Sequence, residues 1–232
     1  MKFPVFYSSG PFADSIVLSE ETSKHVAGVL RMEEGEKVGI TNGKGHFYTT
    51  EITSIHKKKT VVKIISSDLH QPQKIAHTIG ISLLKNTARF EWFLEKATEL
   101  GIARIVPLIC ERTEKQGFRF DRMQQICISA MLQSQQVYLP ELEEPVFFNK
   151  YFSRDFELQR YLAHCLPDDS KLNLSQVQRT GPVNVLIGPE GDFTQLEIAL
   201  AKEKGFIPVS LGTNRLRTET AGLAAALWLT LE

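Results

Sequence analysis

The stretch Val185-Leu186-Ile187-Gly188-Pro189-Glu190-Gly191-Asp192-Phe193-Thr194 decides how this sequence is interpreted. The apolar run Val183–Ile187 predicts a buried strand. The glycines and the proline that follow it predict a tight turn, in which backbone groups can approach a ligand without a Cβ in the way. Thr194 and Glu197 have the spacing of a capping box, so a helix is expected to begin there.

A second junction between a strand and a turn follows in the same part of the chain. The expected helix runs to about Lys204, with Gly205 as its left-handed stop, and Phe206–Leu211 is expected to form a strand. The segment Gly212–Thr220 then leads into an Ala- and Leu-rich helix over Ala221–Leu229. In a parallel sheet both junctions open at the same carboxyl edge, which is where open α/β sheets bind ligands.

These motifs, taken in order, resemble the C-terminal signature of the RsmE family, which belongs to the SPOUT class of RNA methyltransferases. The resemblance is carried by Leu186-Ile187-Gly188-Pro189-Glu190-Gly191, by Leu211-Gly212, and by Leu216-Arg217-Thr218-Glu219-Thr220-Ala221. It implies an α/β trefoil-knot domain that uses S-adenosyl-L-methionine to methylate N3 of a uridine in 16S ribosomal RNA. It also implies a homodimer. Pattern alone predicts no knot, because un-knotted connections are the default.

The resemblance places the cofactor on these motif segments. The residues expected to bind S-adenosyl-L-methionine are Leu186, Ile187, Gly188, Pro189, Glu190, Gly191, Leu211, Gly212, Leu216, Arg217, Thr218, Thr220 and Ala221. For Glu190, a structural role is favoured, in which the carboxylate accepts backbone N–H groups and fixes the loop.

Arg217 and Glu219 are the expected catalytic residues. Uridine N3 carries a proton at neutral pH, so a carboxylate such as Glu219 could accept that proton. An arginine such as Arg217 could stabilise the charge that spreads onto the uridine carbonyl oxygens. The alternative is structural: Thr218 caps the last helix, and Glu219 complements the helix dipole.

Basic residues at two places are candidates for RNA binding. Lys57, Lys58 and Lys59 are consecutive in a predicted hairpin turn, although such a run is more often a solvated turn. Lys85 and Arg89 follow the first predicted strand of the α/β part, where they could contact RNA phosphates beside the cofactor.

Residues 1–70 have the pattern of a small β-barrel. Short apolar runs predict several strands, Ser19 is expected to cap a helix over Glu20–Leu30, and Asn42-Gly43 is a strong hairpin signal. The stretch His25–Asn42 resembles the PUA-like RNA-binding barrel of the RsmE family. The polar segment Asp68–Gln73 is the expected linker to a second domain, residues 73–232.

In residues 73–232, predicted strands alternate with predicted helices, which implies a mostly parallel sheet covered by helices on both faces. The elements expected before Val183 are a strand over Ile79–Leu84, a polar turn over Lys85–Arg89, a helix over Phe90–Leu100 ending at Gly101, a strand over Ile102–Ile109, a helix from Asp121 to about Gln136, and a strand over Tyr161–Leu166.

Composition restricts the class of protein. Lys+Arg and Asp+Glu are 27 each in 232 residues, so the net charge is zero; this argues against a general nucleic-acid binder but permits a local basic face. The 3 cysteines are widely spaced, as in reduced cytoplasmic proteins, and no apolar run reaches membrane-spanning length. The 6 histidines are scattered, so no metal site is expected.

Other functions stay open at this point. A SPOUT methyltransferase could act on another RNA nucleotide, and a non-catalytic RNA-binding assembly factor could keep the fold. A third possibility is that the turn Gly188–Gly191 holds a nucleotide phosphate. Against it, the turn lacks the Gly-Lys-Ser/Thr order of a P-loop.

Overall fold

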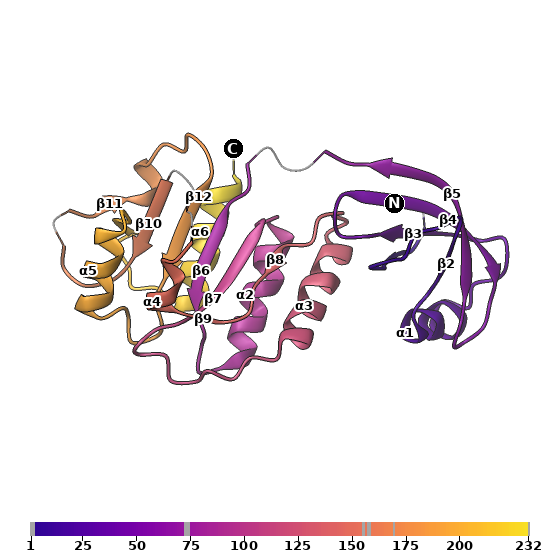
Figure 1. Cartoon of the computed structure of the whole chain (residues 1–232), viewed down its shortest axis with the longest axis horizontal. Helices are drawn as coiled ribbons and strands as arrows, with labels where there is room; N and C mark the ends of the chain where they lie inside the picture. Colours follow the sequence, from indigo (N-terminus) through magenta and orange to yellow (C-terminus); the bar gives the residue numbers. More distant parts are fainter. Residues whose placement is uncertain (1–2, 72–74, 155, 157–158, 169, 232) are drawn as a thin grey trace. The chain divides into compact units, whose positions relative to one another are not determined.

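The computed structural model describes residues 3–71, 75–154, 156, 159–168 and 170–231 (Figure 1). Contacts within the chain divide it into two compact units. The first comprises residues 1–72 together with 131–139, and the second comprises 73–130 together with 140–232. The expected linker Asp68–Gln73 begins inside a strand, and its Pro72 and Gln73 lie outside the described residues.

The first unit contains a five-stranded sheet of half-barrel type with the order β1-β3-β4-β5-β2. Its strands are β1 (Val5–Tyr7), β2 (Ser15–Val17), β3 (Lys37–Thr41), β4 (His46–Ser54) and β5 (Val61–Leu69). β1 pairs with β3 in parallel, and the other pairs are antiparallel. β1 and β2 are the edges, and the described residues show no pairing between them, so the expected barrel is not closed.

Helix α1 (Glu20–Lys24) of the first unit begins as the sequence predicts. The Ser19 side chain accepts a hydrogen bond from the backbone N–H of Thr22, 3.1 Å away. The helix continues as a π-helical segment, η1 (His25–Val29). Val26 lies in the core of this unit, together with Val38 and Ile40 of the sheet.

The hairpin predicted at Asn42-Gly43 is present, with a loop of four residues between β3 and β4. Asn42 Oδ1 accepts hydrogen bonds from the backbone N–H groups of Lys44 and His46. The same loop binds a distant segment of the unit: Gly45 N–H donates to Val137 O, and Leu139 N–H donates to Gly43 O. These bonds explain why residues 131–139 belong to the first unit.

The second unit contains an eight-stranded sheet with the order β11-β13-β10-β12-β6-β7-β8, and β9 also pairs with β7. Every described pair in it is parallel. The strands are β6 (Thr78–Ser82), β7 (Arg104–Ile109), β8 (Glu141–Leu142), β9 (Val146–Phe147), β10 (Gln159–Ala163), β11 (Leu172–Asn173), β12 (Val183–Ile187) and β13 (Ile207–Ser210). Because β10 lies between β12 and β13, the two predicted strand-to-turn junctions do open at one edge.

Helices cover both faces of this sheet. The helices are α2 (Thr87–Glu99), α3 (Phe120–Gln133), α4 (Phe148–Tyr151), α5 (Gln195–Glu203) and α6 (Thr218–Thr230), with a 3-10 turn, η2 (Leu174–Gln176). α6 packs on α2 and on strands β6 and β12. On the other face, Leu186 of β12 shares a buried cluster with Phe148 of α4 and Ile198 of α5.

The starts of α2 and α6 differ from the sequence prediction, and α3 begins at Phe120, one residue before the predicted Asp121; the starts of α1 and α5 agree with the prediction. α2 begins at Thr87, not Phe90, because the Asn86 side chain accepts the Ala88 N–H; Arg89 is therefore helical. Thr218 is the first residue of α6 and not its cap; Arg217 is the N-cap residue and makes no side-chain cap bond. The capping box of Thr194 and Glu197 is present as predicted.

The contact of α6 with α2 and β6 leaves no room for a side chain at Gly222. A Cβ there would lie 2.7 Å from Phe93 Cε2 and 2.8 Å from Ile81 Cδ1. At an open helix position, Gly-to-Ala stabilises by up to about 1 kcal/mol, but overpacking a core costs about 1–3 kcal/mol. We therefore expect Gly222→Ala to lower the melting temperature measured by circular dichroism.

Gly28→Ala is the matched control, because an added Cβ at Gly28 meets no atom within 4 Å. It should leave the melting temperature unchanged or raise it. A Gly222→Ala variant that melts at or above the wild-type temperature would contradict this account of the packing.

Candidate functional site

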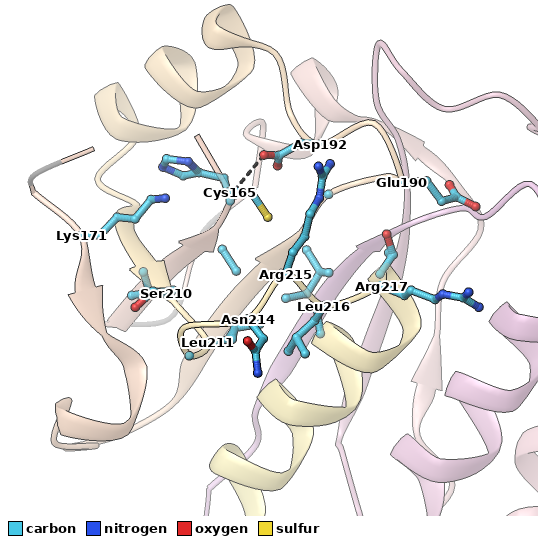
Figure 2. A pocket seen from close by; sticks show the side chains of 18 of the residues that line it. Cys165, Lys171, Glu190, Asp192, Ser210, Leu211, Asn214, Arg215, Leu216 and Arg217 are labelled. Carbon is cyan, nitrogen blue, oxygen red and sulfur yellow. Dashed lines mark hydrogen bonds between the residues drawn. The ribbon is translucent and has the colours of Figure 1, made fainter. Parts of the chain in front are cut away.

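A cavity of about 600 Å³ opens at the carboxyl edge of the second unit's sheet. Its walls are the residues that follow β10, the turn after β12 and the loop between β13 and α6 (Figure 2). These are the ends of neighbouring parallel strands, which is the usual position of a ligand site in an α/β sheet.

Most of the residues predicted to bind a cofactor line this cavity. They are Ile187, Gly188, Pro189, Glu190, Leu211, Gly212, Leu216, Arg217, Thr218 and Ala221. Leu186, Gly191 and Thr220 are not among the lining residues. Leu186 is fully buried in the core, because its side chain points to the α4 and α5 face of the sheet.

Other lining residues were not predicted from the sequence. They are Ala163, His164, Cys165, Lys171, Asp192, Val209, Ser210, Thr213, Asn214 and Arg215. Ala163 is the last residue of β10, and His164, Cys165 and Lys171 follow it; the predicted strand, Tyr161–Leu166, extended past the observed end of β10 and therefore included the start of this loop. Nothing in the sequence pattern indicated that β10 lies between β12 and β13.

Asp192 joins the turn after β12 to the loop after β10. Its Oδ2 accepts the backbone N–H of Cys165 at 2.8 Å, and its Oδ1 accepts the N–H of Phe193 at 2.9 Å. The residue has a φ of 65°, a left-handed conformation that Asp tolerates better than most residues. Asp192 is thus held by its own side-chain bonds at the wall of the cavity.

Glu190 and Glu197 make similar bonds to the loops after β6 and β7. Glu190 Oε1 accepts the backbone N–H of Lys85 at 3.1 Å, which supports the loop-fixing role favoured from the sequence. Glu197 Oε1 accepts the N–H of Glu111 at 2.9 Å, while its Oε2 accepts the Thr194 N–H in the capping box. The turn after β12 is therefore held by hydrogen bonds to the loops after β6 and β7.

Charged groups order the loop after β10. Hydrogen bonds from the Ser170 side chain and backbone, with Lys202 nearby, hold the pKa of Asp168 at about 2. Burial, followed by the charge of Lys171, lowers the pKa of His164, although its Nε2 is 3.7 Å from Asp168 Oδ2. The lowered pKa favours the neutral form of His164 at pH 7.

Two arginines lie at the end of the cavity formed by the loop before α6. Figure 2 shows Arg215 extending over the cavity, whereas Arg217 points outward from its rim. Glu190 lies on the side of Arg217, and Lys171 lies on the opposite side. The cavity therefore has cationic side chains on more than one wall.

Glu219 does not line the cavity. Its side chain is 10% exposed, and its Oε1 is 3.5 Å from Arg89 Nε. Its Oε2 is buried and has no hydrogen-bond partner among the described residues. The structure thus brings together one predicted catalytic residue, Glu219, and one predicted RNA-binding residue, Arg89, as an ion pair.

The other predicted RNA-binding residues differ in their surroundings. Lys85 Nζ is 2.7 Å from Glu114 Oε2, and the hydrogen bond and charge of Glu114 raise the lysine's pKa. Lys57, Lys58 and Lys59 belong to the first unit, where they are exposed in the turn between β4 and β5.

The part of the chain that the structure describes shows neither a metal centre nor a membrane-spanning helix. It contains no group of three or more His, Cys, Asp or Glu residues that could hold a metal ion. It also contains no helix long and apolar enough to cross a membrane.

The second unit has a parallel α/β sheet with a ligand-sized cavity at its carboxyl edge, and the same chain carries a small β unit. This is the architecture expected of an RNA-modifying methyltransferase. The model of the RNA methyltransferase domain family matches residues 71–230, and that of the RNA methyltransferase PUA domain matches residues 18–65. The chain belongs to this RNA methyltransferase family, which confirms the resemblance found in the sequence.

Individual relatives agree with this assignment. The chain is 27% identical to Ribosomal RNA small subunit methyltransferase E of Rickettsia conorii, over 97% of this chain and 94% of the relative. A probable rRNA-methyltransferase from Porphyromonas gingivalis is 33% identical, with a TM-score of 0.89 and coverage of 98% and 97%. Ribosomal RNA small subunit methyltransferase E from Neisseria gonorrhoeae, solved bound to S-adenosyl methionine, is 28% identical, with a TM-score of 0.85 and coverage of 97% and 95%.

The three cysteines differ in their exposure to solvent, and this difference can be tested. Cys110 and Cys127 are buried, and burial raises the pKa of the Cys127 thiol to about 11 and that of Cys110 further. Cys165 is exposed and lines the cavity. Because the thiolate is the reactive form, we expect iodoacetamide at pH 8 to alkylate Cys165 alone in the native protein, as measured by peptide mass spectrometry.

The denatured chain is the control and should be labelled at all three cysteines. Native Cys165→Ser should take up no label. Alkylation of Cys110 or Cys127 at the rate of Cys165 would contradict the burial described here.

Proposed function

We propose that this chain methylates N3 of a uridine in 16S ribosomal RNA, with S-adenosyl-L-methionine as the methyl donor. The observation that carries the proposal is the convergence of the motif segments on one cavity, in a chain of an RNA methyltransferase family. Ligand pockets have volumes of about 300–1,000 Å³, a range that includes this cavity. The Neisseria gonorrhoeae relative binds S-adenosyl methionine, which supports the choice of donor.

The motif residues that line the cavity are proposed to hold the cofactor, with Leu186, Gly191 and Thr220 supporting them from outside it. When bound, the cofactor supplies an activated methyl group, so the protein contributes mainly placement. Gly212 fits this role: it has a φ of 134°, and a Cβ added there would meet no protein atom within 4 Å. The backbone at Gly212 therefore borders open space.

We propose that Arg217 stabilises the uridine anion. Loss of the N3 proton spreads negative charge onto O2 and O4, and a guanidinium placed at the cavity rim can stabilise that charge by donating to one of these oxygens, which leaves N3 open to the methyl group. Among the described residues no carboxylate forms a salt bridge with Arg217, so its guanidinium donors remain available. Its outward direction in Figure 2 suits a nucleotide that enters from outside.

For Glu219, the geometry favours a positioning role over proton transfer. Its carboxylate pairs with Arg89 and does not line the cavity. We propose that this pair holds the start of α6, and with it Arg217, against α2. The N3 proton then leaves to solvent, which makes the reaction faster at alkaline pH.

We further propose how the two domains share the binding of RNA and catalysis. The PUA-like domain, residues 1–70, would bind RNA with Lys57, Lys58 and Lys59 near phosphates, and residues 73–232 would form the knotted catalytic domain. The substrate would be the RNA of the small ribosomal subunit, in the cytoplasm. Trp92 of α2 and Leu227 of α6 are 40% and 38% exposed, which supports a homodimer formed by these helices.

The function can be tested with purified protein, methyl-labelled S-adenosyl-L-methionine and small subunits from a strain that lacks this protein. We expect 3-methyluridine at a single position of 16S RNA, identified by nuclease digestion and mass spectrometry. The control is Gly212→Val, because the left-handed φ disfavours a β-branched residue; it should lose cofactor binding in calorimetry. Methylation of another nucleotide would show that the substrate has been assigned wrongly.

Arg217→Ala tests the mechanism. Removing one preorganised donor costs about a hundredfold or more in rate, so the single-turnover rate should fall by that order, while cofactor affinity changes little. The variant should also need a higher pH to reach the same fraction of its maximal rate. If cofactor affinity and melting temperature fall together and the rate does not, Arg217 has only a structural role.

A further inference from the structure

Arg112, which follows β7, lies against the turn after β12. Its Nη1 donates a hydrogen bond of 2.7 Å to the carbonyl oxygen of Gly191. A Cβ added to Gly191 would lie 3.2 Å from Arg112 Cδ and 3.3 Å from its Cβ, so the arginine stem packs directly on this glycine. Gly191, which does not line the cavity, thus provides the surface that positions Arg112.

Intrachain carboxylates neutralise three of the neighbouring cations, whereas Lys115 donates to Thr87 Oγ1. Lys85 pairs with Glu114, Arg89 with Glu219, and Arg122 with Glu91. Arg112 differs, since no described carboxylate lies within 4 Å of its guanidinium. Its side chain is exposed and uses one donor on a backbone carbonyl, which leaves its charge and its other N–H groups available.

We propose that Arg112 binds a phosphate of the RNA substrate next to the target nucleotide. The guanidinium fork matches two oxygens of a phosphate, and its bond to Gly191 holds it beside Glu190 and Asp192 of the cavity wall. Contacts of this kind set the register of RNA and carry no sequence information. Arg112 is therefore a positioning residue. This inference rests on the proposed function, because it requires an RNA substrate.

The test measures, by filter binding, the affinity of the protein for the RNA of small ribosomal subunits. The subunits come from a strain that lacks the protein. Arg112→Ala should weaken binding roughly tenfold or more, since a charge-assisted hydrogen bond to a phosphate is lost. The slope of log affinity against log salt should fall by about 0.7, as expected for one lost phosphate contact. Arg112→Lys should restore part of the affinity, because it keeps the charge but not the fork. Calorimetric affinity for S-adenosyl-L-methionine should not change.

Gly191→Ala provides a second variant that acts through the same contact. Its methyl group would displace the Arg112 stem, so it should weaken RNA binding in the wild-type background. It should have no further effect in Arg112→Ala, as expected for a coupled pair. Gly117→Ala is the matched control, because an added Cβ there meets no atom within 4 Å. Lys204→Met, which removes a charge at the amino edge of the sheet, controls for net charge.

The outcomes separate this inference from the proposed function. If wild-type protein binds no small subunits, the proposed function fails. If it binds them and Arg112→Ala binds equally well, with the same salt slope, the proposal for Arg112 is overturned. It is also overturned if Arg112→Ala loses cofactor affinity to the same extent, or if sedimentation shows a changed oligomeric state.

Discussion

Three carboxylates that follow β12 hold the edge of the sheet where the cavity lies. Glu190, Asp192 and Glu197 accept the backbone N–H groups of Lys85, Cys165 and Glu111, which follow β6, β10 and β7. One segment of the chain thereby fixes the loops after three other strands. The cavity wall is therefore set by polar bonds within the protein before any ligand binds.

Hydrogen bonds and ion pairs within the protein also determine which charged side chains remain available to bind a ligand. Carboxylates near the cavity are used on backbone N–H groups or on Lys85 and Arg89. Arg112, Arg215 and Arg217 have no carboxylate within ion-pair distance in the described ranges. A chain with zero net charge can thus present a positive rim to an anionic polymer. The zero net charge argues against a general nucleic-acid binder, but composition does not predict where the charges lie in the fold.

The sequence predicted those parts of the fold that have local signals. The capping box at Thr194, the left-handed stops Gly101 and Gly205, and the hairpin at Asn42 all depend on residues close in sequence, and all are present. The two-residue strands β8, β9 and β11 are too short to show a period. The lining residues after β10 and the pairing of Arg89 with Glu219 depend on strand order and on contacts between distant segments. No local pattern encodes either.

The attachment of Val137–Leu139 to the loop between β3 and β4 has a consequence for synthesis. The first unit includes residues 131–139, so not all of it has been made when its last strand, β5, leaves the ribosome. At about 5–20 residues per second, the missing segment follows roughly 3–14 seconds later. During that interval Gly43 and Gly45 lack their partners, and β6, α2 and β7 of the second unit have already emerged. The two units therefore complete their folding in an overlapping order and not one after the other.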